Sequence, residues 1–131
     1  MADTKILVAT VDGVTICNTT PHAITFGVYE GDEIKAVEVQ SCGVLVNAKA
    51  VTETVKANGG VEFVTTKFEA DEVGKEVLKD IKAAYPEAVI VGSIIAAQAY
   101  PGDVVGMVPL PGYERVAPAE KRMDPHKFSI F

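Results

Sequence analysis

The two arginines of this chain are the side chains best suited to bind an anion, and both lie near its C-terminus. Arg115 and Arg122 fall within residues 113–131, which carry a net charge of +1, whereas residues 1–112 carry −7. A guanidinium group donates paired hydrogen bonds that match a phosphate or a carboxylate. We therefore expect both arginines to bind a small anion, with Tyr113 stacking on a ring of the ligand. A solvated, salt-bridged tail is the alternative interpretation.

A polar turn that contains one of the two histidines is a second candidate. Residues 18–22 read Asn-Thr-Thr-Pro-His, and Asn, Thr and Pro form turns and cap exposed backbone groups. One interpretation is a hydrogen-bonded corner in which His22 is a structural partner. The other is a ligand site at Asn18 and His22, where the histidine donates to a phosphate or acts as a general base.

A third candidate is Gly92-Ser93, which stands between an apolar segment, 88–91, and an apolar heptad, 94–100. We expect Ser93 to cap a short buried helix, whose first backbone N–H groups suit a phosphate. A buried strand over 94–100 is the alternative interpretation of the heptad. A nucleophilic serine is a competing interpretation, although the G-x-S-x-G frame of hydrolases is absent. Gln98 is the lone strongly polar residue of the heptad, so we expect it to tie the helix to the sheet or to contact an edge of the ligand.

No recognisable catalytic or cofactor motif accompanies these candidates. The sequence has no Walker loop, no G-x-G-x-x-G, no zinc signature and no kinase motif. His22, Asp124 and His126 lack the spacing of metal ligands. We therefore assign no catalytic residue, no metal and no cofactor, and the sequence favours a protein that is not an enzyme.

Charge and hydropathy limit the partners. A net charge of −6 over 131 residues argues against a long nucleic acid, which attracts many cations. No run of about 18 apolar residues is present, so no membrane partner is expected. The N-terminus lacks a secretory pattern, and Cys17 and Cys42 lie in apolar stretches. These features predict a cytoplasmic protein with reduced, buried thiols, a Cys17–Cys42 disulfide being the alternative.

The fold class predicted from these patterns is α+β, in one domain over 1–131. It comprises an antiparallel β-rich N-terminal part, one amphipathic helix, a short buried helix and an irregular C-terminal arm. The predicted strands cover 5–11, 14–18, 23–29, 34–39, 43–46, 51–55, 61–68, 88–91 and 103–108.

Local signals fix several boundaries of this prediction. Asp12-Gly13 is a favoured two-residue hairpin turn. An apolar stripe at helical spacing predicts a helix over 71–84, which Pro86 ends. Four prolines in 109–131 argue against long regular elements there. The apolar side chains of that arm nevertheless predict that it packs on the body or on a neighbouring subunit.

Two segments resemble parts of known proteins. Residues 18–25, Asn-Thr-Thr-Pro-His-Ala-Ile-Thr, resemble the opening of a broad group of small phage and prokaryotic proteins, most of them uncharacterised. Residues 91–99, Val-Gly-Ser-Ile-Ile-Ala-Ala-Gln-Ala, resemble the glutamine-containing apolar segment near their C-terminal third. In size and β-rich build the chain is also similar to the anti-Thoeris sponges, phage proteins that sequester cyclic ADP-ribose-type immune signals as oligomers without cleaving them. That similarity carries over no individual binding residue.

Three functions are compatible with these features. The first is a homo-oligomeric phage protein that sequesters a small phosphorylated cyclic nucleotide and so counters host immune signalling. The second is a small hydrolase of a phosphorylated substrate that uses His22 with Ser93 or an acid. The third is a phage structural or assembly protein that binds no small ligand. The clustered arginines and the missing catalytic constellation favour the first.

Overall fold

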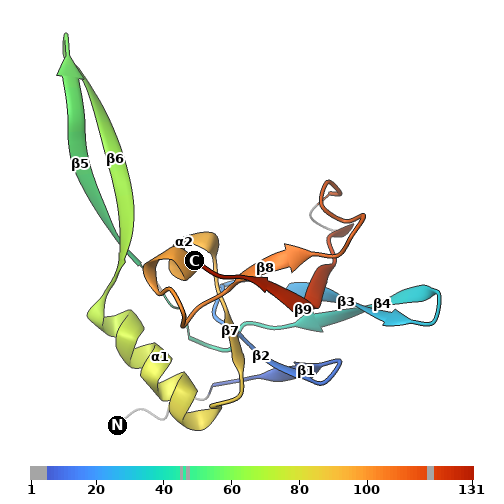
Figure 1. The fold of residues 1–131 in the computed structure, drawn as a ribbon. Helices are drawn as coiled ribbons and strands as arrows, with labels where there is room; N and C mark the ends of the chain where they lie inside the picture. The colour runs from blue at the N-terminus through green and yellow to red at the C-terminus, as the bar shows by residue number, and fades with distance from the viewer. Residues whose placement is uncertain (1–5, 45, 47, 118–119) are drawn as a thin grey trace.

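The computed structural model describes residues 6–44, 46, 48–117 and 120–131. In these residues it is a mixed α+β structure rich in strands, with three sheets and two helices (Figure 1). The predicted fold class is thereby confirmed. That the whole of 1–131 forms a single domain stays a prediction.

The first sheet has the order β1-β2-β7 and contains β1 (Ala9–Val11), β2 (Val14–Asn18) and β7 (Val89–Val91). The turn between β1 and β2 is the predicted Asp12-Gly13, with φ of 47° and 83°. Positive φ at both residues defines the tight turn that matches the twist of a hairpin. The partner of β2 on its other side is β7, which runs parallel to it. Polar segments that come after these two strands therefore meet at one edge.

The second sheet has the order β4-β3-β9-β8. Its strands are β3 (Ile24–Glu30), β4 (Glu33–Val39), β8 (Gly106–Pro109) and β9 (Met123–Ser129). The prediction of an irregular C-terminal arm misses β9, although this strand lies inside the sheet. The C-terminal segment forms a strand despite its proline because one residue of β8 faces four residues of β9, including Pro125, where the register shifts. A bulge is one of the few places where a sheet accepts a proline, since no ladder donor is needed there.

A long two-stranded hairpin forms the third sheet. Its strands are β5 (Ala48–Asn58) and β6 (Val61–Ala70), joined at Gly59-Gly60, and it extends away from the other sheets (Figure 1). The sequence predicts only a short strand, 51–55, in the first half of this hairpin. It also predicts a strand over 43–46, which the structure does not contain at 43, 44 and 46; residue 45 lies outside the described residues.

Helix α2 begins at the predicted cap, whereas α1 begins one residue later than predicted, with Asp71 as its cap. Helix α1 (Glu72–Ala84) begins after Asp71, whose Oδ1 accepts from the N–H of Gly74 at 2.6 Å. Helix α2 (Ile94–Ala99) begins after Ser93, whose Oγ accepts from the N–H of Ala96 at 3.1 Å. The short helix is buried on one side only: Ala96 and Ala97 are buried, whereas Ile94 is 64% exposed. Neither described helix is long and apolar enough to cross a bilayer.

Two apolar clusters hold the elements together. One joins α1 and α2 to the base of the β5–β6 hairpin and includes Leu78, Ile81 and Ala97. The other lies between the first two sheets and includes Ile16 and Phe26, both 0% exposed. The two sheets are also connected directly, through a parallel bridge between Val91 and Val105. This connection places the start of β8 beside the end of β7.

Candidate functional site

The buried side chain of Asn18 stabilises the polar turn through hydrogen bonds. Its Nδ2 donates to the carbonyl oxygens of His22 at 2.7 Å and Val39 at 3.1 Å. Its Oδ1 accepts from the N–H and the Oγ1 of Thr20, at 2.9 and 2.6 Å. A side-chain amide offers two donors and two lone pairs, so these four bonds use its whole capacity. Asn18 is fully buried and positions His22 without facing a ligand itself.

The turn is joined to the end of β7 by Thr19. Both the N–H and the Oγ1 of Thr19 donate to the carbonyl of Val91, at 2.9 and 2.8 Å. Gly92 permits this approach, because a Cβ there would lie 2.8 Å from Val104 Cγ1 and 3.2 Å from Thr19 Oγ1. The N–H of Gly92 donates to the carbonyl of Val105 at 3.0 Å, so this backbone group is already occupied and does not face an anion.

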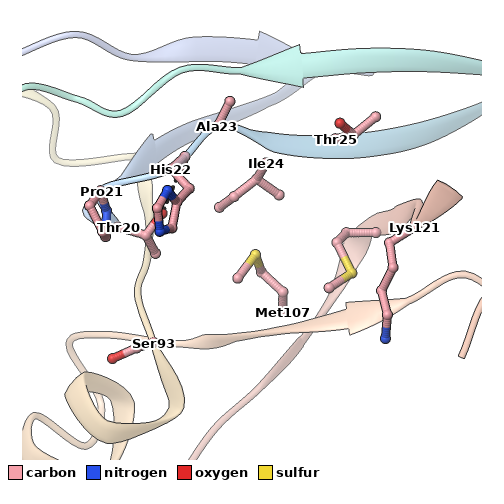
Figure 2. A pocket seen from close by; sticks show the side chains of 10 residues that line it. Thr20, Pro21, His22, Ala23, Ile24, Thr25, Ser93, Met107 and Lys121 are labelled. Carbon is pink, nitrogen blue, oxygen red and sulfur yellow. Dashed lines mark hydrogen bonds between the residues drawn. The ribbon is translucent and has the colours of Figure 1, made fainter. Parts of the chain in front are cut away.

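Beside the joined turns lies a cavity of about 420 Å³, which we call the turn cavity. It is lined by residues from the polar turn, the start of β3, the cap of α2, strand β8 and the approach to β9: Thr20, Pro21, His22, Ala23, Ile24, Thr25, Ser93, Met107, Lys121 and Met123. Figure 2 shows His22 and Ser93 toward one end, Lys121 at the other, and Ile24 and Met107 between them. Its volume falls in the range of pockets that bind small molecules.

The chemistry of the turn cavity is that of an apolar trough with polar ends. Lys121 supplies a cation, and its Nζ donates to the carbonyl of Glu114 at 3.3 Å. Ser93 uses its oxygen as a helix cap, which leaves its hydroxyl proton to donate. None of the described residues that line the cavity carries a carboxylate. Such a site suits a molecule with a flat apolar part and a negative charge.

The arginines lie elsewhere. Arg115 is exposed, and Arg122 donates from Nη1 to the carbonyl of Lys121 at 2.9 Å. The Cβ of Arg122 lies 3.1 Å from where a Cβ on Gly27 would be, and neither residue lines the cavity. Tyr113 is half-buried and donates its N–H to the carbonyl of Leu110 at 2.9 Å. None of the three predicted anion contacts is among the lining residues.

The cation of the turn cavity, Lys121, is missing from the sequence prediction, which weighs residue type above side-chain direction. Neighbouring side chains of an extended chain point to opposite sides, so Lys121 and Met123 share one side and Arg122 takes the other. Both Lys121 and Met123 line the cavity, as this alternation requires. The alternation of side chains in the residues that precede β9 is therefore the sequence feature that indicates Lys121.

The remaining candidates are dispersed. Gln98 is exposed on α2 and is not among the lining residues. His126 Nε2 lies 2.8 Å from Oδ2 of Asp12, and the N–H of His126 donates to Oδ1 of Asp124 at 2.8 Å. Asp124 and His126 line a smaller hollow of about 240 Å³, whereas His22 lines the turn cavity. Over the described ranges, no three His, Cys, Asp or Glu side chains are grouped so that they would hold a metal.

Two free thiols adjoin Asn18 of the polar turn. Cys17 and Cys42 are both 0% exposed and unbridged, as the apolar context of each predicts. The N–H of Cys42 donates to the carbonyl of Asn18 at 2.7 Å, which ties the segment after β4 to the end of β2. The hydrogen bond between the two thiols, together with burial, raises the pKa of Cys17. The same hydrogen bond lowers the pKa of Cys42 to about 7, so the pair loses its first proton at Cys42 and stays protonated at Cys17.

Comparison with protein families, with curated proteins and with solved structures finds no match to this chain. The resemblance of residues 18–25 and 91–99 to small phage proteins therefore stays a prediction.

Proposed function

We propose that this protein binds a small anionic molecule of the nucleotide class in the turn cavity and holds it without cleaving it. The observation that carries the proposal is the cavity of about 420 Å³ with a lysine at one end and a histidine at the other. Lys121 replaces the two arginines as the group that pairs with phosphate. Ile24, Met107 and Met123 form the apolar surface on which a base or another flat ring packs.

Sequestration is favoured over hydrolysis by the state of the polar groups. A serine nucleophile needs a neighbouring base that is itself oriented by a third group. Here Ser93 Oγ accepts from the N–H of Ala96, and the described lining residues include no carboxylate that would orient His22. We therefore expect a bound nucleotide to be recovered intact. In a phage protein this activity would lower the free concentration of a cyclic nucleotide signal in the host.

Calorimetry with cyclic ADP-ribose isomers, cyclic dinucleotides and AMP tests the proposal. Lys121→Ala should weaken binding by about 10- to 100-fold, since a hydrogen bond to a charged group contributes roughly 1.5–3 kcal/mol. Lys127→Ala is the matched control, because Lys127 is an exposed lysine of β9 outside the cavity. Failure of the wild type to bind any of these compounds, or equal affinities for the two variants, would overturn the proposal. Turnover of the bound compound would instead support the hydrolase.

A further inference from the structure

The β5–β6 hairpin, which we call the arm, lacks the support that such a structure needs. It extends away from the rest of the protein (Figure 1), and its outer part exposes large apolar side chains: Val55 at 67%, Val61 at 54%, Phe63 at 56% and Val64 at 49%. A two-stranded hairpin without a covering layer is marginally stable in water. The arm should therefore be covered by something outside this single chain.

The register of the arm separates a charged face from a neutral one. Directly opposed residues share a face. Between the base and the irregularity at Val55, one face carries the pairs Ala48–Ala70, Ala50–Phe68, Thr52–Thr66 and Thr54–Val64. These eight residues, the neutral face, include no charged side chain. The opposite face carries Lys49–Glu69, Val51–Lys67 and Glu53–Thr65 over the same length.

The neutral face continues the protein core outward. At its base, Ala48, Phe68 and Ala70 are half-buried against the cluster that contains α1 and α2. Further out, Thr52, Thr66 and the other members of the face are exposed. Helix α2 contacts both strands of the arm at this base. Its Ile94 and Ile95 are 64% and 43% exposed, so uncovered apolar surface is present at both ends of the arm.

Charge favours a second copy of this chain over a nucleic acid or an anionic membrane as the occupant. Residues 48–70 contain three Lys and three Glu, so the arm is neutral, while the remainder of the chain holds the whole net charge of −6. A nucleic acid or an anionic membrane would require a basic surface, which the arm does not offer. A neutral face meets the neutral face of another acidic copy without charge repulsion. Such a self-complementary patch is what a two-fold interface requires.

The size of the arm limits the surface area that a contact between two arms can bury. Strands of 10 and 11 residues are about 35 Å long at about 3.3 Å per residue, and two strands are about 10 Å wide. Two arms in face-to-face contact thus bury at most about 700 Å², less than half of a typical specific interface, because the base of each neutral face already packs on its own chain. If the arms run antiparallel, the tip of each reaches the base of the other. Contact of each tip with Ile94 and Ile95 of the other copy adds to this area.

We propose that the neutral faces of two arms pack together in a two-fold dimer, with each arm's tip resting on Ile94 and Ile95 of the other copy. The face-to-face packing removes Val64 and Thr66 from water on both copies. Phe63 alternates with Val64 along β6 and so lies on the side of the charged face, outside this contact. The proposal is independent of the turn cavity and stands whether or not a nucleotide binds there.

Adjacent threonines on opposite faces of the arm provide the test. Thr66→Lys places a charge on the neutral face, whereas Thr65→Lys places the same charge on the charged face, opposite Glu53. Analytical ultracentrifugation should show a wild-type dimer at micromolar concentration, retained in Thr65→Lys and weakened at least tenfold in Thr66→Lys. A wild type that is monomeric at 100-fold higher concentration, or equal effects of the two variants, would overturn the proposal.

Hydrogen exchange of the wild type provides a second test that needs no variant. Amides of β5 and β6 should become more protected as the protein concentration rises through the dimer dissociation constant. Amides of β3 should not change, because Phe26 and its neighbours are buried within one chain. Arm exchange that is independent of concentration would contradict the proposal, even if Thr66→Lys fails to fold.

Discussion

The region around the turn cavity and the arm differ in the interactions that stabilise them. Around the cavity, buried polar groups such as Asn18 satisfy one another, and two parallel strands bring distant segments to one edge. Along the arm, the backbone ladder is long but the side chains of both strands face solvent. The cavity region is therefore stabilised within one chain. In the proposed dimer, the arm gains its stability from the surface of a second copy.

The largest difference between the regions should appear when a phenylalanine is truncated in each. Phe26 is 0% exposed and Phe63 is 56% exposed. Phe26→Ala should lower the free energy of unfolding by about 3–5 kcal/mol, through lost burial and the cavity that remains. Phe63→Ala should change it by less than about 0.5 kcal/mol at concentrations where the protein is monomeric. Urea unfolding measures both, and similar losses would contradict the comparison.

Removing the amide at the centre of the polar turn should have the next largest effect. Asn18→Ala abolishes four hydrogen bonds and leaves the carbonyl oxygens of His22 and Val39 without this donor. We expect a loss of about 3 kcal/mol in unfolding free energy. Asn58→Ala, at the exposed end of β5, is the control and should cost much less. A loss below about 1 kcal/mol for Asn18→Ala would show that the turn does not depend on this side chain.

A methyl group at the junction of the two turns should have a smaller effect. Gly92→Ala would place a Cβ 2.8 Å from Val104 Cγ1, so neighbouring groups must shift. Overpacking of this kind typically costs about 1–3 kcal/mol. Gly106→Ala is a matched control, since its Cβ would lie no closer than 3.6 Å to any neighbour. Thermal unfolding of the two variants should therefore differ by several degrees, and equal melting temperatures would argue against a tight junction.

The smallest expected effect is on the free energy of unfolding at alkaline pH. The pKa of Cys17 is raised by its hydrogen bond to Cys42 and by burial, and burial first of all raises the pKa of Tyr100. In both cases the unfolded chain loses its proton first, so stability is complete below the ordinary pKa and falls as the pH rises above it. The same hydrogen bond lowers the pKa of Cys42 to about 7, so Cys42 adds stability as the pH rises from about 7 to 9. Above about pH 9 the free energy of unfolding should decline, by about 1.4 kcal/mol per pH unit for the suppressed ionisation of Cys17. Cys17→Ala should flatten the first part of this decline, and an unchanged profile would contradict the assignment.

Features of the fold that depend on local chemistry could be predicted from the sequence. The Asp12-Gly13 turn and the cap Ser93 are examples, because a positive φ or an unpaired N–H demands particular residue types. The arm was underestimated for the opposite reason. With both faces of β5 in solvent, its apolar residues do not alternate with polar ones, and the usual signal of a strand is lost.

Features that depend on tertiary context could not be predicted in full. Strand β9 tolerates Pro125 only because the register with β8 shifts there, which no local pattern reveals. The heptad after Ser93 indicated a buried helix, yet Ile94 and Ile95 are exposed where we propose a second copy to bind. Around the candidate site, the segments 18–22 and 92–93 were identified, but the meeting of Lys121 with them depends on the path of the C-terminal segment.

The central claim is that the turn cavity binds the anion through Lys121, and a single calorimetric comparison tests it most directly. Lys121→Ala is compared with the double variant Arg115→Ala/Arg122→Ala, each titrated with the nucleotide that the wild type binds. The account predicts that the lysine variant loses at least tenfold in affinity while the arginine variant stays within about threefold of the wild type. Loss of binding in the arginine variant with full affinity in Lys121→Ala would contradict it.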